Sequence, residues 1–563
     1  MQSLPLWTPL ASVALALAWL LPNAYPPWLA FHKDAWLAAV MCVVAIVWQC
    51  GERRARTAFR MDPIAAAFLA MALLAFVQWR IGIIHFFGHF SMALMYFGGA
   101  ALAIVLGRDW AQRNRDQLGD FLFFALLVAA FATSFTLIVQ WLQVWQWMGT
   151  WIQEVRPFDQ PYGNLNQPNN AATLVVLGAV SVSWFAYRRL VNVRVWLIAC
   201  SYLAFFIAIT GSRIGYLTFS TLSLGVLVVG WRTGHLPANW RRAFIVLIFA
   251  FVAWVVLVHS NWGASRDLTL EGPRVFERDL TSIRLYLWRA YLHTAYTHPL
   301  IGFGFEQGML TQMAAGEIGY QLNGLYTWSH NALLDIATWF GFPMFIVAVA
   351  LIVWVVWRIF KSSADSSRWI FLAGVYAVTL HGLVELPLGF AYFLIPVCLM
   401  LGALFESLDL PSIAIPRIVV AVWTVSLATM LAALTYDYFR IEAAFYTWRF
   451  ERSNIGKSHP QDIPDTLLLD QFEALLRGLR GSADSLTSRQ VDEFERAIVH
   501  EPSTAAMQHL AEIRARQGDL SGAQRAADMA AITAQPKRRK LLAARWRYLT
   551  LQNPSFANVH WAE

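Results

Sequence analysis

A histidine stands where a long polar segment meets a new apolar run, in the stretch Tyr326-Thr-Trp-Ser-His330-Asn331. An imidazole at such a boundary can move protons, because its ordinary pKa lies close to working pH. A single histidine at the start of an apolar run more often has a structural role at the interface. The other polar residues of the chain therefore decide the interpretation, and they favour His330 as the catalytic candidate.

Arginines in otherwise apolar surroundings form a second set. Arg213 lies in the tight turn Thr-Gly-Ser-Arg213-Ile-Gly and has no carboxylate near it in the sequence. It either extends to a membrane interface or binds an anion, and we favour the anion. Arg80 is costly at membrane depth unless it faces water or an anion. Arg284 and Trp288 belong to an amphipathic stretch that predicts a helix on the membrane surface.

A segment rich in carboxamides precedes another apolar run, first Arg156-Pro-Phe-Asp159 and then Gly-Asn-Leu-Asn166-Gln167-Pro-Asn169. Asn169 is suited to cap the helix that follows. The density of Asn and Gln nevertheless exceeds what one cap needs. Carboxamides donate and accept hydrogen bonds together, which suits the hydroxyl groups of sugars. We therefore favour a polar substrate site here.

An imidazole, a carboxylate and a phenol surround a predicted hairpin, at His381, Glu385 and Tyr392. His381 and Glu385 are four residues apart and hence on one face of a helix. They either pair with each other or contribute to a site, and the sequence leaves both possibilities open.

Glycine and proline punctuate the segment Pro299-Leu-Ile-Gly302-Phe-Gly304. Their spacing predicts a turn and close packing. No strand precedes the segment and no third glycine follows at the required spacing, so it does not match a dinucleotide-binding loop.

The elements that position these residues are membrane-spanning helices. Of 563 residues, 58% are hydrophobic and only 14% are charged, and the mean hydropathy is +0.48. This composition is typical of a polytopic membrane protein. Apolar runs of about 20 residues recur and predict an all-α fold with about 12–13 transmembrane helices. The runs lie near 6–22, 36–50, 63–79, 88–107, 119–145, 170–187, 195–211, 213–231, 243–260, 332–357, 369–386, 389–407 and 416–436.

Basic residues in alternate short loops predict the orientation, because cationic loops tend to stay cytoplasmic. We therefore expect a cytoplasmic N-terminus. An odd number of spans then places the segment 261–331 and the C-terminal region outside, in the periplasm of a diderm bacterium. Most of the formal net charge of +8 comes from these loop arginines, so we expect no nucleic-acid partner. The arginine-rich loops lie near 53–60, 108–115, 188–194, 232–242 and 358–368.

Taken together, the motifs resemble the bacterial O-antigen ligase and polymerase superfamily, over most of the membrane region. The outer-loop Gln-Pro-Asn, a Tyr-Pro-Pro-Trp28 entry and the Glu-x-Pro-Leu hairpin are most similar to protein O-oligosaccharyltransferases, which glycosylate pilins and other exported proteins. Asn170 stands where that family often has His, and Leu386 where an aromatic residue is common, so neither position is assigned a role. The motifs are Gly163-Asn-Leu-Asn-Gln-Pro-Asn169, Gly211-Ser-Arg213-Ile-Gly, Arg284 with Trp288, Pro299-Leu-Ile-Gly-Phe-Gly304, Ser329-His330-Asn331 and Val384-Glu385-Leu-Pro387-Leu.

The resemblance implies a GT-C-like membrane glycosyltransferase with a large periplasmic loop. It implies transfer of a preassembled glycan from an undecaprenyl-diphosphate carrier to an acceptor hydroxyl, at the periplasmic face of the inner membrane and without a metal or cofactor. Arg213 and Arg284 would hold the diphosphate. His330, with a pKa near working pH, would act on the acceptor hydroxyl as general base or orient it. The further substrate-binding candidates are Arg80, Arg156, Asn166, Gln167, Asn169, Glu385 and Tyr392.

The polar remainder of the chain predicts a second domain, 437–563, after a transmembrane domain, 1–436. Apolar residues recur at helical spacing from about 467 to 535, and the run Met507 to Gly518 resembles one helical hairpin of the tetratricopeptide type. Such a domain either recruits a protein acceptor or covers the outer loops, and both interpretations stay open.

Several alternatives follow from the same sequence. We expect a periplasmic, pilin-like protein as acceptor, through Ser or Thr hydroxyls, but an O-antigen ligase that transfers glycan to lipid A-core needs the same carrier site. A transporter or lipid flippase also has many spans and intramembrane arginines. Against it, the polar residues gather on one predicted outer face, and no inverted repeat is evident. A scaffold that acts through its tail is the least favoured.

Overall fold

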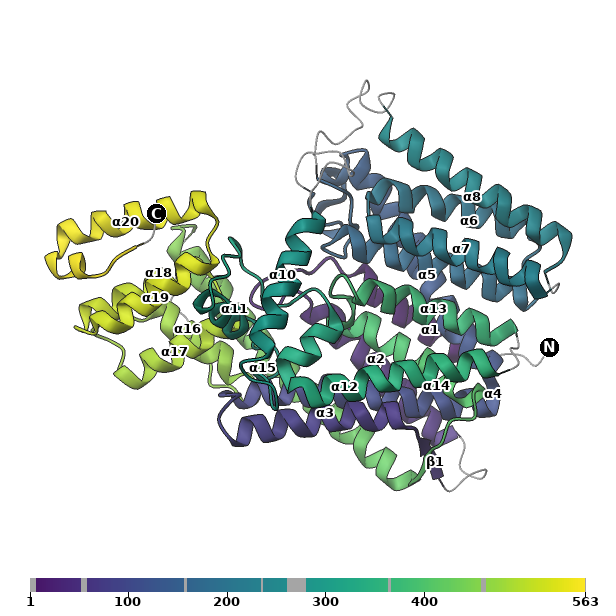
Figure 1. Cartoon of the computed structure of the whole chain (residues 1–563), viewed down its shortest axis with the longest axis horizontal. Helices are drawn as coiled ribbons and strands as arrows, with labels where there is room; N and C mark the ends of the chain where they lie inside the picture. The colour runs from purple at the N-terminus through teal and green to yellow at the C-terminus, as the bar shows by residue number, and fades with distance from the viewer. Residues whose placement is uncertain are drawn as a thin grey trace. The chain divides into compact units, whose positions relative to one another are not determined.

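The computed structural model of the chain describes residues 7–51, 58–155, 159–233, 236–260, 280–362, 366–456 and 462–561. Nearly all of the regular structure there is helical (Figure 1). The exception is a short antiparallel pair, β1 (Ala58–Met61) and β2 (Ile413–Pro416). The predicted all-α fold is therefore confirmed.

Nine of the described helices are long and apolar enough to cross a membrane. The other expected spans fall on three shorter helices, α1 (Trp7–Leu20), α13 (Ser366–Gly382) and α14 (Ala391–Ser407), since α4 contains two of them. The chain is thus a polytopic membrane protein. The nine helices are α2 (Phe31–Gly51), α3 (Pro63–Arg80), α4 (Phe87–Trp141), α5 (Pro168–Tyr187), α6 (Val193–Thr210), α7 (Arg213–Thr233), α8 (Ala238–His259), α12 (Ala332–Lys361) and α15 (Arg417–Arg452).

Two long helices test the spans expected from hydropathy. α4 consists of two helices that meet at a kink inside the expected loop 108–118, at Asn114, where φ is −156° and ψ is 86°. α15, in contrast, continues past residue 436 to Arg452. Helix formation depends on backbone hydrogen bonds and residue propensity, not on apolar character, so a polar stretch does not have to end a helix. The domain division at 436/437 falls inside α15 and stays a prediction.

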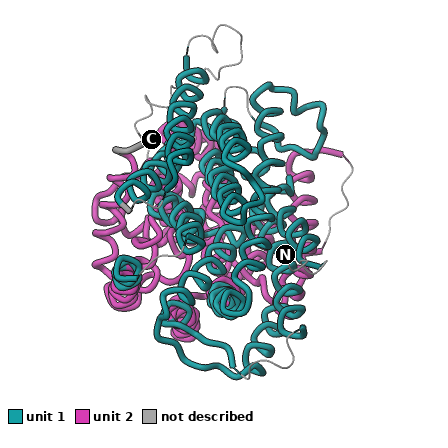
Figure 2. The backbone as a smooth tube through the Cα atoms, turned by 90° about the vertical axis from the view of Figure 1, so that its right-hand side faces the viewer, with its two compact units in different colours: residues 1–66, 99–280, 353–428 teal, residues 67–98, 281–352, 429–563 magenta. Residues whose placement is uncertain are grey.

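Two compact units divide the chain (Figure 2). Unit 1 contains residues 1–66, 99–280 and 353–428, and unit 2 contains residues 67–98, 281–352 and 429–563. Within unit 1, α5 packs against α6, α7 and α13, and α8 packs against α6 and α7. A Cβ added to Gly402 of α14 would lie 2.3 Å from the Ile104 carbonyl oxygen of α4. Small residues thus allow the closest helix contacts, as is common in membrane bundles.

Unit 2 combines parts of membrane helices with α10 (Leu280–Ala295), α11 (Gly308–Glu317) and the C-terminal helices. One buried cluster contains Met71 of α3, Phe97 of α4 and Phe340 of α12. A second contains Tyr291 of α10 and Leu334 of α12. The first turns of α12 are therefore packed against three other helices of the same unit.

The C-terminal helices form successive hairpins. α16 begins at residue 470 and α18 at residue 504, 34 residues later, which is the period of tetratricopeptide repeats. Each helix packs on the next from α16 to α19. The predicted helical hairpin is confirmed, and the structure has two. The helices are α16 (Asp470–Arg480), α17 (Ser488–His500), α18 (Thr504–Arg516), α19 (Leu520–Thr533) and α20 (Pro536–Gln552).

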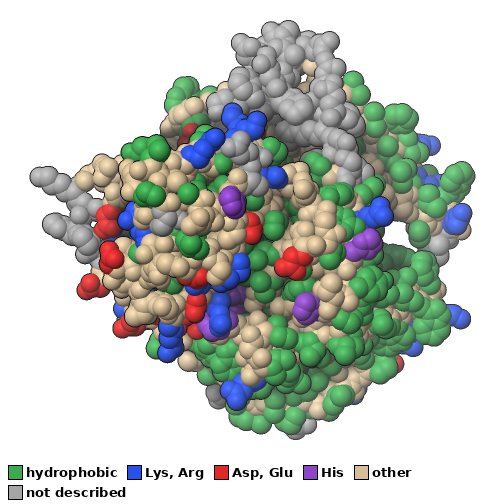
Figure 3. Space-filling view, turned by 60° about the vertical axis from the view of Figure 1, so that its left-hand side comes forward, with side chains coloured by type: hydrophobic (Ala, Val, Ile, Leu, Met, Phe, Trp, Pro, Cys, Tyr) green, Lys and Arg blue, Asp and Glu red, His purple; other side chains and the backbone are tan. Residues whose placement is uncertain are grey.

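Large apolar side chains cover wide areas of the surface seen in Figure 3. Among the exposed apolar residues of the membrane helices, Leu10 is 72% exposed, Phe249 71% and Phe360 84%. Apolar surface of this extent is unfavourable in water, and it is expected where helices contact lipid.

Candidate functional site

The carboxamide-rich loop of unit 1 is held by a buried glutamine from α4. Gln140 Nε2 donates to the Gly163 carbonyl at 2.8 Å, and Gln140 Oε1 accepts from the N–H groups of Tyr162 and Gly163 at 3.0 and 2.7 Å. The Asn164 side chain donates to the Leu20 carbonyl at 2.6 Å. These two carboxamides therefore fix the backbone of the loop.

Two further carboxamides of this loop, Gln167 and Asn169, are bound to the hairpin that follows α13. Gln167 Nε2 donates to one oxygen of Glu385 at 3.2 Å, and Asn169 Nδ2 donates to the other at 3.4 Å. Asn169 Oδ1 accepts from the Ser212 hydroxyl at 2.7 Å. A helix cap is therefore the wrong interpretation of Asn169. The structure brings together three of the predicted substrate-binding residues, and Ser212 joins them although the sequence gives it no role.

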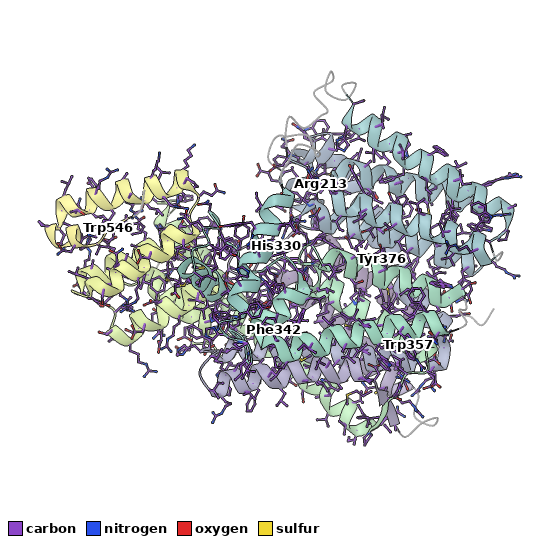
Figure 4. All side chains as sticks on the ribbon, in the orientation of Figure 1. Arg213, His330, Phe342, Trp357, Tyr376 and Trp546 are labelled. Carbon is purple, nitrogen blue, oxygen red and sulfur yellow. The ribbon has the colours of Figure 1, made fainter. Side chains whose placement is uncertain are left out.

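Arg213 begins α7 directly after this network. Ser212 caps α7, because its hydroxyl accepts from the Gly215 N–H at 3.1 Å. Gly211 ends α6 with φ +61°, a left-handed conformation that reverses the chain in one residue. Arg213 itself is half-buried (Figure 4). Its guanidinium and the partial positive charge of the helix N-terminus both favour an anion here.

Two other candidates of unit 1 are buried. His381 Nδ1 lies 2.9 Å from the Thr173 hydroxyl. Tyr392 is only 2% exposed, and its ring lies edge-on to Trp19. This is the position of a core residue, so we leave Tyr392 out of the proposed site.

His330 lies in a sharp turn of unit 2, immediately before α12. Its φ of +58° is in the left-handed region, which few residues other than glycine adopt. Asn331 caps α12, since its Oδ1 accepts from two N–H groups of the first turn at 3.1 and 3.2 Å. The buried carboxylate of Asp335 accepts from the Ser329 N–H at 2.8 Å. The turn is therefore held on both sides of the histidine.

The loop before His330 is anchored by α10 and α11. The Tyr291 hydroxyl donates to the Tyr326 carbonyl at 2.6 Å. Gln312 Nε2 donates to the Gly324 carbonyl at 2.6 Å, and its Oε1 accepts from the Tyr326 N–H at 2.9 Å. Burial raises the pKa of Tyr291, so its hydroxyl stays a donor. The sequence singles out neither anchor, because nothing distinguishes them from other polar residues on apolar helices.

The Pro-Leu-Ile-Gly-Phe-Gly segment lies against a break in α12. At the break Gly341 has φ +80° and ψ 173°, and the Phe303 N–H donates to the carbonyl of Thr338 at 2.7 Å. A Cβ added to Gly302 would lie 2.5 Å from the carbonyl carbon of Trp339. The predicted close packing is therefore confirmed, and only glycine fits at residue 302.

A buried glutamine of α3 joins this segment to α12. Gln78 Nε2 donates to the carbonyls of Ile301 and Trp339 at 2.8 and 2.6 Å, and its Oε1 accepts from the Phe305 N–H at 3.3 Å. Since α12 begins two residues after His330, this clamp also fixes the helix that carries the histidine.

Burial and the charge of Arg284 lower the pKa of His330 to about 4. Loss of solvent disfavours the imidazolium form, and a nearby guanidinium disfavours it further. The expectation of a pKa near working pH is therefore wrong. Arg284 is half-buried on α10, and His330 (Figure 4) is neutral at neutral pH, so it can accept a proton.

The remaining predicted residues have exposed or undescribed positions. Arg80 is exposed at the end of α3, with its guanidinium 5.6 Å from the ring centroid of Trp79. Asn166 is exposed and has φ +62°. Arg156 lies outside the described residues. Thus Arg80 and Asn166 are open to a ligand, but the structure does not tie them to the hydrogen-bonded groups above.

Over the described ranges, no three His, Cys, Asp or Glu side chains are grouped so that they could hold a metal ion. Metal independence remains a prediction that needs its own test, because the absence of such a group does not define the reaction.

Family comparisons match both the segment that contains His330 and the segment that contains Glu385. The sequence model of the O-antigen ligase family matches residues 198–349, which include Arg213, Arg284 and His330. A second model, the C-terminal part of the virulence factor membrane-bound polymerases, matches residues 369–544, which include Glu385. The chain belongs to the O-antigen ligase and polymerase superfamily. The predicted resemblance is therefore confirmed.

Two curated relatives come from Acinetobacter baylyi. A general O-oligosaccharyltransferase is 24% identical over 532 residues, which are 90% of this chain and 88% of the relative. A ComP-specific O-oligosaccharyltransferase is 24% identical over 341 residues, which are 60% of each chain. With the first relative aligned over nearly its whole length, this superfamily member is a glycosyltransferase.

Proposed function

We propose that this chain transfers an oligosaccharide en bloc from an undecaprenyl-diphosphate carrier to Ser or Thr hydroxyls of a periplasmic protein, such as a pilin. The names of both relatives support a glycan donor and a protein acceptor. The orientation inferred from the loop arginines supports an active site and C-terminal helices on the periplasmic face of the inner membrane.

The observation that carries the proposal is the state of His330. Its imidazole is neutral because its pKa lies at about 4, and it is fixed in a strained turn beside the cation of Arg284. A neutral imidazole accepts a proton from a hydroxyl, while a guanidinium binds phosphate oxygens. Acceptor activation and donor binding are thus available in one unit.

The reaction step follows from these two groups. The acceptor hydroxyl oxygen forms a bond to the anomeric carbon of the first sugar, and His330 takes the hydroxyl proton. The bond between that carbon and the phosphate oxygen breaks, and its electron pair leaves with the carrier diphosphate. Arg284 stabilises the negative charge that grows on the diphosphate. The carrier leaves as its diphosphate, and the protonated His330 returns its proton to solvent.

The polar network of unit 1 supports binding of the donor. Arg213 would bind diphosphate oxygens, and Gln167 and Asn169, whose orientation is set by Glu385, would position the glycan. Each carboxamide retains hydrogen-bonding capacity beyond these contacts. Arg80, Arg156 and Asn166 remain further candidates for contacts with the glycan or carrier.

A transfer assay with purified protein tests the proposal. The donor is an undecaprenyl-diphosphate oligosaccharide, and the acceptors are a pilin-like periplasmic protein and lipid A-core, each with and without a chelator. His330→Ala and Arg284→Ala are compared with His293→Ala and Arg289→Ala. Both controls lie on α10, the helix that carries Arg284, and both His293 and Arg289 are exposed.

We expect glycan on the protein acceptor, loss of transfer in the two site variants and retention in the two controls. Glycan only on lipid A-core would make the chain an O-antigen ligase. Transport of an intact donor without transfer to either acceptor would favour a flippase.

A further inference from the structure

The last helix of the chain, α20, has two apolar faces, of which only one is covered. Leu542, Ala543 and Trp546 are buried, and α20 packs against the following 3-10 turn (Pro554–Asn558). Gln508 of α18 donates to the Leu542 carbonyl at 3.3 Å. Trp546 (Figure 4) donates to the Phe556 carbonyl at 3.1 Å and stacks on the ring of Phe556. This face accounts for the packing of α20 in its domain.

The second apolar face is exposed. Leu541, Tyr548 and Leu551 are 57%, 61% and 83% exposed, and Ala544 between them is exposed as well. Among the described residues, α20 is not one of the helices that are long and apolar enough to cross a membrane, so this surface is not that of a predicted span. Their spacing of three, four and three residues is that of positions a and d in a heptad, the seam of paired helices.

Cations border this stripe on both sides. In the same heptad, Lys540 and Arg547 take the g positions, and Arg538 and Arg545 take the e positions. α20 contains no Asp or Glu. Within the described part of the chain, Lys540, Arg538 and Arg545 make no ion pair. In helix pairs the e and g positions select the partner by charge, so this face fits a helix with an apolar seam and acidic borders.

Contacts within unit 2 connect α20 with the loop that leads to the proposed base. The Arg539 guanidinium donates to the Asn323 side chain, seven residues before His330. Gly316 of α11 packs against Ile532 of α19. A protein bound to α20 is therefore bound to a helix that contacts the loop before His330.

We propose that the exposed heptad face of α20 is the docking site for an acidic amphipathic helix of the acceptor protein. The inference rests on the proposed transfer to protein. A helix is favoured over a lipid surface, since the stripe is narrow and has heptad spacing.

The experiment measures binding of a labelled 21-residue peptide to the full chain in zwitterionic nanodiscs, by fluorescence anisotropy. One peptide has Leu at a and d and Glu at e and g; a second has Lys in place of Glu. The chain variant is Lys540→Glu with Arg545→Glu. The control of equal charge change is Arg489→Glu with Arg525→Glu, at exposed positions on α17 and α19.

We expect the acidic peptide to bind the wild type and the control, and to bind the α20 variant at least tenfold more weakly. The Lys peptide should show the reverse preference. Fusing the acidic helix to a Ser-containing acceptor peptide should lower its KM at least tenfold for the wild type and the control, but not for the α20 variant.

Equal binding of both peptides by wild type and variant overturns the proposal. So does capture of phosphatidylglycerol vesicles that depends on α20 without binding of the acidic peptide, because the face would then contact lipid. Peptide binding that depends on α20, without any glycan transfer to protein, would mean that the docking site is correct and the proposed function is wrong.

Discussion

The neutral state of His330 predicts how transfer depends on pH. With a pKa of about 4, nearly all of the free enzyme, about 97%, has a neutral His330 at pH 5.5. An imidazole with the ordinary value of 6.5 would be only about 9% neutral there. The two cases differ about tenfold in kcat/KM at pH 5.5, because kcat/KM reports the essential groups of the free enzyme.

We expect kcat/KM for wild-type transfer to stay level from pH 8 down to about 5.5 and to fall below that. Donor binding brings an anion to Arg284, which weakens its repulsion of the imidazolium and raises the pKa of His330. The inflection in kcat should therefore lie at higher pH than the inflection in kcat/KM. Initial rates on a soluble acceptor, at saturating and limiting donor, separate the two profiles.

Arg284 provides the internal control. Arg284→Lys keeps the positive charge and should keep the low inflection, whereas Arg284→Gln should raise it. His330→Gln should remove the inflection along with most activity, and its residual profile corrects for titration of the substrates. A wild-type kcat/KM that falls with a midpoint near 6.5, and that Arg284→Gln does not shift, would refute this account of the base.

Three further substitutions have outcomes that follow from contacts and burial in the structure. Gly302→Ala should lower stability by about 2–4 kcal/mol in thermal unfolding and reduce transfer, because it adds left-handed backbone strain and a steric clash with Trp339. Gly319, with φ +94° and open space around it, is the control, and Gly319→Ala should show the strain alone. Equal effects of the two substitutions would exclude a contribution from the clash. Glu385→Gln weakens two charge-assisted bonds, so kcat/KM for the donor should fall about tenfold; an unchanged KM would contradict that role. Burial and then Glu306 raise the pKa of Glu501 to about 8. Its contribution to stability is therefore complete below its ordinary pKa near 4.5 and is lost as pH rises to about 8, so Glu501→Gln should remove on the order of 2 kcal/mol of the decline in stability between pH 5.5 and 8; a parallel decline in the variant would contradict it.

Helix content and the membrane class could be predicted because both follow from composition and period. Hydropathy correctly predicts a break between two spans of α4, which the structure has at Asn114. It failed where the chain stays helical without being apolar, in the second half of α15. The pKa of His330 could not be read from the sequence either. It depends on burial and on Arg284, which is 46 positions away in the chain, and only the fold defines that environment.

The carboxamides show most clearly what residue type leaves undecided. Gln78, Gln140 and Gln312 are each buried, and each binds backbone groups of neighbouring segments, so they stabilise the loops. Gln167 and Asn169 instead bind a side chain, Glu385. Asn169 also accepts a hydrogen bond from Ser212, the residue that precedes Arg213.

In the sequence all five are amides next to apolar runs, and their chemistry is the same. What separates them is the partner. An amide that satisfies backbone groups has its hydrogen bonds fixed by the fold, and replacing it should cost stability, since buried backbone groups lose their partners. An amide oriented by a carboxylate keeps bonding capacity for a ligand, and replacing it should cost donor affinity first. The five carboxamides thus divide into three that support loops and two that can bind a ligand, and only the structure supplies this division.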